Sequence, residues 1–339
     1  MKKEKILVTG GCGFIGSLCV LKLLEDGYEP VIIDDFSNSS PEVLNRIYKI
    51  SGLRPKCYHS DLRKQSDLEQ IFSENKFNAV IHFAGKKSVK ESEEIPLEYY
   101  AVNVGASIVL LETMKKHDVK KLIFSSTATV YGNNNNSPLT EKATLAPINN
   151  YGKSKLMVED IIASICKADK EWSSVILRYF NPVGAHPSGL MGEDPNGIPA
   201  NLMPFISQVA TGRLKELSIF GDDYPTRDGT GERDYIHVLD LVDAHINSLS
   251  LLNRKGLEVI NIGTGHGVTV KELVNTFSRV NEVNIPYKIV GRRLGDSAIC
   301  FADPTKAKEV LGWVAKRGVE EMCRDSWNWQ RKNPKGYKA

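Results

Sequence analysis

The sequence has little that would place the chain in a specialised class of protein. Its six cysteines, in 339 residues, show no C-x-x-C spacing, so we expect neither a disulfide framework nor a zinc site. No apolar run approaches the roughly 18 residues of a membrane span, and the run near the N-terminus is too short for a secretory signal. The net charge of +3 is too small to indicate nucleic acid or membrane as a partner. We therefore expect a cytoplasmic protein that binds no metal ion.

Short apolar runs alternate with longer amphipathic segments through the first half of the chain. The predicted strands are Lys5–Thr9, Pro30–Ile33, Lys56–His59, Ala79–Phe83, Lys121–Ser125 and Ser174–Arg178. The predicted helices include Ile15–Glu25, Leu68–Glu74, Leu97–Met114 and Tyr151–Ile165, with Asp303–Leu311 and Val319–Trp327 near the C-terminus. Such alternation is typical of an α/β fold with a doubly wound parallel sheet covered by helices on both faces.

A glycine-rich turn, Thr9–Gly16, follows the first predicted strand and opens the first predicted helix. In this context Gly10 permits a tight turn, and Gly13 lets the backbone approach a pyrophosphate. Gly16 allows the helix to pack closely on the strand, and the helix N-terminus supplies partial positive charge. The turn therefore predicts a dinucleotide site of the Rossmann type.

Carboxylates after the second and third predicted strands are candidates for the adenosine half of the cofactor. Asp34 lies 18 residues beyond Gly16, where a carboxylate accepts bonds from the ribose hydroxyls and repels a 2′-phosphate. This favours NAD over NADP, with Asp35 as an alternative for the same role. Asp61 is either a partner of the adenine amino group or a residue that caps its own loop.

Tyr151 and Lys155 are four residues apart at the start of a predicted helix, so they share one face. A tyrosine with a pKa of about 10 is a poor base at neutral pH, but a nearby ammonium and a positive nicotinamide ring would favour the phenolate. The spacing alone is common on surface helices, and the upstream turn makes it informative. Thr127 is the candidate partner of the same substrate hydroxyl, with Ser125 and Ser126 as alternatives.

Together these residues resemble the extended short-chain dehydrogenase/reductase superfamily, and within it the family of UDP-galactose 4-epimerases. The likeness runs nearly end to end, through Thr9–Gly16, His82–Lys87, Ser125–Gly132, Tyr151–Lys155, Arg178–His186, Gly192–Phe205, Arg233–Val238 and Arg292–Asp296. It implies that the chain interconverts UDP-galactose and UDP-glucose with a bound NAD. Tyr151 would take the proton of the sugar 4-hydroxyl while C4 gives up its hydride. The 4-keto sugar would then rotate and accept the hydride on its opposite face.

The resemblance also implies which residues line each ligand. Beside the residues already named, the NAD would contact Phe14, Ile15, Asn38, Leu62, Phe83, Ala84, Gly85, Lys87, Asn103, Ser125 and Tyr179. The UDP-sugar would contact Lys87, Thr127, Tyr151, Asn181, Asn201, Leu202, Phe220, Arg233, Arg293, Asp296 and Cys300. Guanidinium groups suit a diphosphate, an aromatic ring suits uracil, and an acid suits a ribose. The family further implies a homodimer formed through helices.

Two positions depart from the common pattern of the family. Thr127 stands where many relatives have serine, which keeps the hydroxyl and adds a methyl group. Cys300 stands where some relatives carry a bulky aromatic residue close to the 2-substituent of the sugar. The smaller side chain would leave room for an N-acetyl group, so we expect activity on UDP-GlcNAc and UDP-GalNAc as well.

Other functions on the same scaffold fit the sequence less well. A 4,6-dehydratase needs an acidic pair after the hydroxyl residue, whereas this chain has Ala128 and Thr129. A UDP-glucuronate decarboxylase or an NADP-dependent sugar reductase disagrees with the C-terminal motifs, and the reductase also with Asp34. A non-catalytic NAD-binding regulatory module would lack the tyrosine or the lysine, and both are present.

The amino-acid composition of the chain changes after about residue 180. Glycine and proline cluster from Pro182 to Pro204 and again from Gly221 to Gly231, and loop-rich segments of this kind often carry binding groups. We expect a Rossmann-type NAD-binding domain over residues 1–180 plus roughly 237–262. A smaller α/β C-terminal lobe over residues 181–236 and 263–339 would bind the UDP-sugar.

Overall fold

The computed structural model describes residues 3–133, 135–293 and 295–338. Leu294, within the Arg292–Asp296 motif, therefore lies outside the described residues. The chain forms two compact units. Unit 1 comprises Met1–Gly132, Leu145–Arg178 and Val242–Ile260, and unit 2 comprises Asn133–Thr144, Tyr179–Leu241 and Asn261–Ala339.

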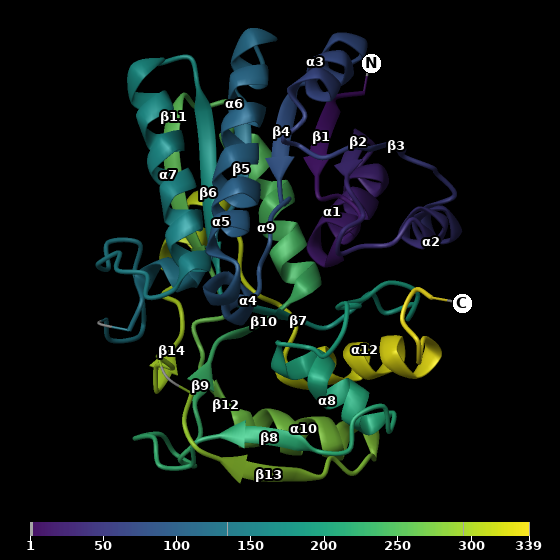
Figure 1. The fold of residues 1–339 in the computed structure, drawn as a ribbon, viewed down its shortest axis with the longest axis vertical. Helices are drawn as coiled ribbons and strands as arrows, with labels where there is room; N and C mark the ends of the chain where they lie inside the picture. Colours follow the sequence, from purple (N-terminus) through teal and green to yellow (C-terminus); the bar gives the residue numbers. More distant parts are fainter. Residues whose placement is uncertain (1–2, 134, 294, 339) are drawn as a thin grey trace. The chain divides into compact units, whose positions relative to one another are not determined.

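Unit 1 is built on a parallel sheet, shown in Figure 1, whose strand order is β3-β2-β1-β4-β5-β6-β11. The strands are β1 (Lys5–Thr9), β2 (Glu29–Asp34), β3 (Lys56–His59), β4 (Ala79–His82), β5 (Lys121–Ser125), β6 (Ser173–Tyr179) and β11 (Gly256–Ile262). Each neighbouring pair from β3 to β6 is parallel. The predicted α/β fold with a doubly wound sheet is confirmed, and β11 is a strand that the sequence pattern did not identify.

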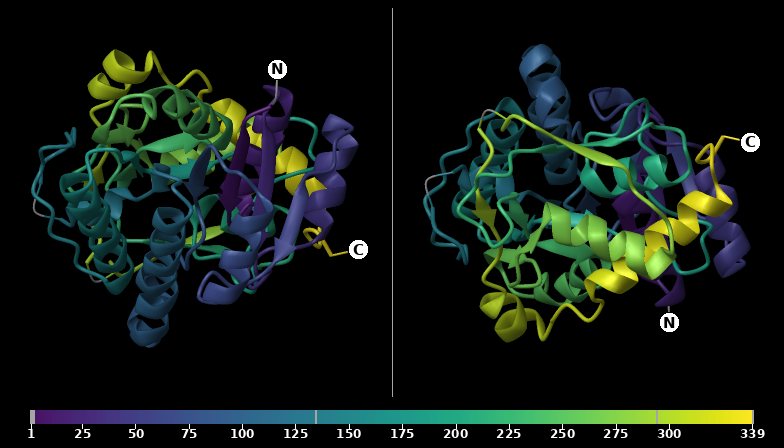
Figure 2. Two further views of the ribbon diagram at one scale, coloured as in Figure 1. Left: turned by 90° about the horizontal axis from the view of Figure 1, so that it is seen from above. Right: turned by 90° about the horizontal axis from the view of Figure 1, so that it is seen from below.

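The helices of this region are α1 (Phe14–Glu25), α2 (Glu42–Ser51), α3 (Gln65–Glu74), α4 (Val89–Glu94), α5 (Pro96–Tyr99), α6 (Ala106–Lys116), α7 (Asn150–Ala168) and α9 (Val238–Leu251). Helices α3, α6 and α7 share one apolar core with the sheet, to which Leu68, Leu110 and Val158 contribute. In the views of Figure 2, α6 and α7 lie on the same side of the strands. Each of these helices packs against the sheet through its buried apolar side chains, and this packing sets the position of α7.

The helix predicted over Leu97–Met114 is present, but it is not regular throughout. The structure has α5, then a wider π-helical turn η1 (Tyr100–Gly105), then α6. Apolar spacing over a few residues does not distinguish a wider turn from a regular one, so the apolar pattern does not predict η1. Such turns often occur at functional sites, and η1 carries Asn103.

The carboxyl ends of the parallel strands gather the predicted dinucleotide residues of unit 1 at one edge. The glycine turn follows β1, Asp34 ends β2, Phe83 follows β4 and Ser125 ends β5. Strand β1 lies between β2 and β4, which is the point where the order of the strands reverses. Ligands of open α/β sheets bind at this switch point.

Unit 2 combines short strands with helices. Its strands are β7 (Asn181–Val183), β8 (Leu217–Phe220), β9 (Glu232–Arg233), β10 (Tyr235–His237), β12 (Val268–Thr269), β13 (Tyr287–Val290) and β14 (Ile299–Cys300). Its helices include α8 (Leu202–Ala210), α10 (Val270–Asn281), α11 (Thr305–Leu311) and α12 (Val319–Lys332). The faces of α8, α10 and α12 meet in one core around Ile206, Phe277 and Met322.

None of the described helices is long and apolar enough to cross a membrane. Among the same residues, no group of three or more His, Cys, Asp or Glu side chains could hold a metal ion. All six cysteines are free thiols, and four of them are buried.

Candidate active site

The turn between β1 and α1 contains close approaches that only glycine allows. Gly10 has φ of +67°, and a Cβ there would lie 2.8 Å from the amide nitrogen of Ala84. A Cβ on Gly16 would lie 2.2 Å from the carbonyl oxygen of Gly10, so α1 packs directly on the turn. Gly13 is the N-cap of α1 and has no side chain to cap the first amides of the helix. Those amides are left for an anion, so the turn fits a pyrophosphate.

Asp34 anchors this turn from the end of β2. Its carboxylate accepts bonds from the amide of Cys12 (2.9 Å), the amide of Phe36 (3.0 Å) and the hydroxyl of Ser39 (2.7 Å). Burial raises the pKa of Asp34 above its ordinary value, although these bonds act the other way. The neighbouring Asp35 is exposed. Of the two acids, Asp34 is therefore the one that is held against the glycine turn.

The remaining candidates for the adenosine half occupy varied positions. Asp61 accepts the amide of Arg63 at 2.9 Å and pairs with its guanidinium at 2.6 Å. It therefore caps its own loop, and a role at the adenine stays a prediction. Leu62 packs in the core of unit 1, whereas Asn38 is exposed.

The three hydroxyls that follow one another at the end of β5 have different partners. Ser125 Oγ lies 2.8 Å from His245 Nε2, and Ser126 Oγ donates to Glu159. Both serines are fully buried, while Thr127 retains 7% exposure. The hydroxyls of the serines are thus engaged inside the protein. Thr127 Oγ1 lies 2.8 Å from Thr129 Oγ1, but its partial exposure makes it the best placed of the three for a substrate.

Helix α7 presents Tyr151 and Lys155 on one buried face. The helix begins there because the side chain of Asn149 caps it, accepting the amide of Gly152 at 2.8 Å. Lys155 Nζ donates to the carbonyl oxygen of Ser125 at 3.0 Å. The lysine therefore links α7 to the end of β5.

Burial dominates the electrostatics of this pair. It raises the pKa of Tyr151 to about 12, with the hydroxyl of Thr127 acting in the opposite direction. It lowers the pKa of Lys155 to about 8, with the charge of Glu159 acting against it. The ammonium of Lys155 is directed to the carbonyl of Ser125, and its influence on the phenolate stays a prediction. A positive nicotinamide ring would also lower the pKa of the tyrosine.

Asn103 joins three segments beside this face. Its Oδ1 accepts the amide of Lys86 at 2.8 Å, and its Nδ2 donates to the carbonyl of Lys86 (3.0 Å) and to Ser154 Oγ (2.9 Å). A Cβ on Gly85 would lie 3.0 Å from Asn103 Oδ1. The amide side chain is thus fully used in fixing the segment after β4 to α7, which argues for a supporting role at the cofactor site.

The other residues that the resemblance assigns to the cofactor are more open. Phe14, Ile15 and Ala84 are half-buried near the glycine turn, Lys87 is exposed, and Tyr179 is half-buried at the end of β6. The ring of Phe83 lies 4.7 Å from that of His245, centroid to centroid. None of these positions conflicts with a cofactor contact, and each contact stays a prediction.

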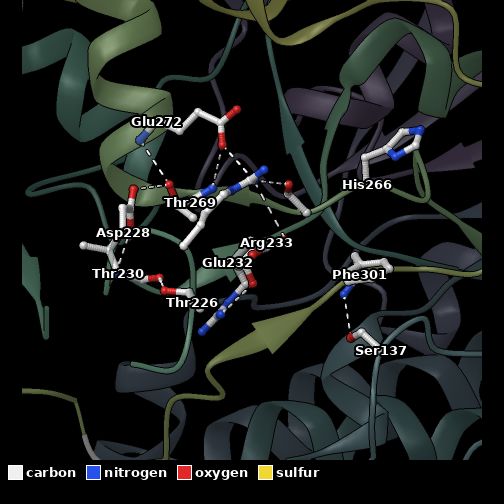
Figure 3. Close-up of polar contacts among 12 residues, drawn as sticks. Ser137, Thr226, Asp228, Thr230, Glu232, Arg233, His266, Thr269, Glu272 and Phe301 are labelled. Atoms are coloured by element: carbon white, nitrogen blue, oxygen red, sulfur yellow. Dashed lines mark hydrogen bonds and ion pairs between the residues drawn. The ribbon is translucent and has the colours of Figure 1, made fainter. Parts of the chain in front are cut away.

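In unit 2, several of the predicted UDP residues meet around β9. Cys300 on β14 is the register partner of Arg233 on β9. Arg233 Nη2 lies 3.7 Å from Asp296 Oδ1, and both side chains are partly exposed. Its Nη1 donates to the carbonyl of Glu232, and Figure 3 shows the two residues side by side. The structure therefore brings Arg233, Asp296 and Cys300, which are predicted for the diphosphate, the ribose and the sugar, together within unit 2.

Phe220 and Arg293 are in direct contact. The guanidinium carbon of Arg293 lies 3.9 Å from the centroid of the Phe220 ring, which is a cation–π geometry. A uracil that stacked on this ring would have to displace the guanidinium. Asn201 is the N-cap of α8 and donates to Glu193 at 3.1 Å, with Leu202 half-buried after it, while Asn181 is exposed.

Hydrogen bonds connect the loop before β9 to the start of α10, as Figure 3 shows. Asp228 accepts the hydroxyl of Thr269, the N-cap of α10, and the amide of Thr230 at 2.9 Å. A pocket of about 460 Å³ beside it is lined in part by Arg227 and Glu272, which pair at 2.8 Å. None of the predicted site residues belongs to its described lining, and we assign it no ligand.

Sequence reasoning missed the groups that support the catalytic face from beneath. Glu159 and Arg178 form a buried ion pair next to Ser126, and His245 lies against Ser125. The position of Glu159, four residues after Lys155, is a local signal that puts it on the same face of α7. No local signal identifies His245, because 120 residues separate it from Ser125.

Comparisons with known proteins show which family the chain resembles over nearly its full length. The family described as GDP-mannose 4,6 dehydratase matches residues 7–326. A UDP-glucose 4-epimerase of Bacillus subtilis is 54% identical over 335 residues, covering 98% of this chain and 99% of the relative. The human UDP-glucose 4-epimerase is 52% identical over 342 residues, covering 98% of both. The crystal structure of the Bifidobacterium longum enzyme with NAD+ and UDP has a TM-score of 0.95 at 49% identity, covering 98% of this chain and 99% of that one.

Proposed function

The chain belongs to the family of UDP-glucose 4-epimerases, within the extended short-chain dehydrogenase/reductase superfamily, and on that premise we propose that it interconverts UDP-galactose and UDP-glucose. The observation that carries this proposal is that more than half of the residues are identical to those of such enzymes over nearly the full length of the chain. Both Tyr151 and Lys155 are present, on one buried face of α7. NAD, when bound, accepts the hydride of the sugar C4 and returns it. The reaction consumes no external oxidant.

The residues of unit 1 supply the proton chemistry. Tyr151 takes the proton of the 4-hydroxyl and returns it after the sugar has turned, so it acts first as base and then as acid. The hydroxyl of Thr127 orients the substrate hydroxyl. Lys155 contributes positive charge beside the reacting groups, and Asp34 holds the adenosine ribose at the glycine turn. Because the tyrosine is buried, water is kept from competing for its proton.

The residues of unit 2 hold the UDP. Arg233 and Arg293 each offer a planar guanidinium to the diphosphate. Asp296, which pairs with Arg233 at 3.7 Å, would exchange that partner for the uridine ribose. Asn201 and Leu202 at the start of α8 bind the base. These assignments are supported by the contact of Arg233 on β9 with Asp296 and by the residue types that each part of UDP requires.

The description of the matching family names a 4,6-dehydratase, but the residues of this chain favour epimerisation. A 4,6-dehydratase must expel the 6-hydroxyl of the sugar, which requires an acid near Thr127. The next two positions are Ala128 and Thr129, and the hydroxyl of Thr129 lies 2.8 Å from that of Thr127. Neither can donate a proton as an acid does at neutral pH.

Proton NMR of UDP-galactose, incubated with the purified protein and no added cofactor, tests the proposal directly. Growth of the anomeric signal of UDP-glucose is the expected result, and it would also reveal NAD carried through purification. The Tyr151→Phe variant is the control for contaminating activity. If no UDP-glucose forms even after NAD has been added, the epimerase proposal is wrong.

We further propose that the enzyme interconverts UDP-GlcNAc and UDP-GalNAc. Cys300 is half-buried beside Arg233, and its small side chain leaves space where an aromatic ring would fill it. The same NMR assay with UDP-GlcNAc measures this activity. Brisk turnover of UDP-galactose without any turnover of UDP-GlcNAc would contradict the proposal.

We also propose that the protein is a cytoplasmic homodimer. Neighbouring helices of unit 1 expose apolar side chains, with Leu97 of α5 85%, Met157 of α7 45% and Ile108 of α6 39% exposed. Such a concentration is typical of an interface, and free thiols suit a reducing compartment. Light scattering of the wild type should give twice the chain mass, and Leu97→Glu should shift it towards the monomer. Leu53→Glu, at a residue 45% exposed elsewhere, should leave the dimer intact.

A further inference from the structure

A buried ion pair lies directly beneath the catalytic face of α7. Glu159 on α7 and Arg178 on β6 are each 4% exposed. Arg178 Nε donates to both carboxylate oxygens at 3.1 Å, and its Nη2 donates to Glu159 Oε2 at 2.5 Å. A pair of this kind is costly to bury, and apolar residues of similar volume often stabilise a fold as well. Its presence here therefore calls for a role besides stability.

The pair holds both ends of the segment that carries Thr127. At one end, Ser126 Oγ donates to Glu159 and Ser126 N donates to the carbonyl of Leu177 at 2.9 Å. At the other end, Arg178 Nη1 donates to Tyr131 Oη at 3.2 Å and the guanidinium lies 5.1 Å from the centroid of that ring. Thr127 lies between the two attachments.

The same pair is continuous with the helix that carries the acid–base residue. Tyr151, Lys155 and Glu159 are spaced four residues apart on α7, so they form one line along its buried face. Lys155 attaches α7 to the carbonyl of Ser125 at 3.0 Å, and Glu159 attaches it to the next residue. Two adjacent bonds therefore set where the segment 125–127 stands against α7.

We propose that Glu159, held by Arg178, is a positioning residue of the epimerase, and that it sets the Thr127 hydroxyl relative to the Tyr151 phenol by accepting the hydroxyl of Ser126. This inference rests on the proposed function. Proton transfer needs its partners within a narrow range of distances, and a misplacement of about 1 Å costs roughly 100-fold in rate. Glu159 touches neither substrate nor cofactor in this role.

The electrostatics of the pair are consistent with the geometry. Burial lowers the pKa of Arg178, but its bonds to Glu159 outweigh this and raise the pKa above its ordinary value. The Glu159 side chain accepts these bonds from Arg178, and it accepts the hydroxyl of Ser126 as well.

Ser126→Ala removes the hydrogen bond from Ser126 to Glu159 and leaves the ion pair between Glu159 and Arg178 in place. We expect kcat for UDP-galactose to fall by about 10- to 100-fold, while KM and the NAD content of the protein stay as in the wild type. Ser126→Thr, which restores a hydroxyl, should recover most of the lost kcat. Ser126→Cys replaces the hydroxyl by a slightly larger thiol with a weaker donor, so it should give an intermediate kcat, and it serves as the test if the alanine variant does not fold.

Ser248→Ala is the matched control, because Ser248 is also fully buried but donates only to the carbonyl of Ala244 within its own helix, at 2.7 Å. It should show wild-type kcat. An unchanged kcat in Ser126→Ala, a loss confined to KM or NAD content, or a loss that threonine fails to restore would each overturn the positioning role. A wild type that leaves UDP-galactose unchanged would instead overturn the proposed function, and the positioning role with it.

Discussion

Replacement of Lys155 by methionine should change how the stability of the protein depends on pH. The ammonium of Lys155 is buried, and burial lowers its pKa from 10.5 to about 8. Between these two values the unfolded chain binds a proton that the folded chain does not. The free energy of unfolding therefore rises with pH through this window, and the penalty for the buried charge is fully present below about pH 8.

The size of this penalty follows from the shift. A difference of about 2.5 pKa units corresponds to about 3 kcal/mol at pH 7, at roughly 1.4 kcal/mol per unit, and it falls to roughly 1 kcal/mol at pH 10. Lys155→Met removes the penalty but also removes the charged bond to Ser125, which is worth about 2 kcal/mol while the lysine is protonated. The stability of the variant relative to the wild type should therefore fall by about 2 kcal/mol between pH 7 and pH 10.

Urea unfolding of NAD-free protein at pH 7, 8.5 and 10 measures this difference. NAD must be removed because a ligand that binds only the folded state adds its own stability. Lys153→Met is the control, since Lys153 is exposed on the same helix and is solvated whether the chain is folded or not. The reasoning is refuted if wild type and Lys155→Met give parallel stability curves over this range.

Three further predictions concern single residues. Tyr151→Phe should lower kcat by about 10²- to 10⁴-fold, because it removes the acid–base group, while calorimetry should still detect NAD and UDP binding; retained turnover would exclude Tyr151 as that group. Gly16→Ala should reduce NAD binding strongly, because the new Cβ would lie 2.2 Å from a backbone oxygen, whereas Gly318→Ala, with nothing within 4 Å of its Cβ, should bind NAD normally; equal titrations of the two would contradict this. Cys300→Tyr should abolish turnover of UDP-GlcNAc and preserve that of UDP-galactose in the NMR assay, and loss of both activities would show that residue 300 does not select the sugar.

Much of unit 1 was predictable because its signals are local. Strands such as Lys5–Thr9 and Lys121–Ser125 are short apolar runs whose bounds the structure reproduces. The glycines of the turn are recognisable in the sequence because a side chain at Gly10 or Gly16 would clash with neighbouring backbone atoms. Tyr151 and Lys155 share a face for the simple reason that an α-helix repeats every 3.6 residues.

The predicted contacts of unit 2 depended on the resemblance. No spacing rule links Phe220 to Arg293 or Arg233 to Asp296. The first contact needs the pairing of β8 with β13, and the second forms where β9 pairs with β14.

The sequence by itself determined the fold class, the dinucleotide turn and the face of α7 that carries the acid–base pair. Only the tertiary structure decided how these parts are held in register. Glu159 meets Arg178 across 19 residues and Ser125 meets His245 across 120, and the protonation of Lys155 depends on burial by segments far apart in the chain. The physical reason is that periodicity and turn chemistry act between near neighbours, whereas burial and ion pairing depend on which distant segments pack together.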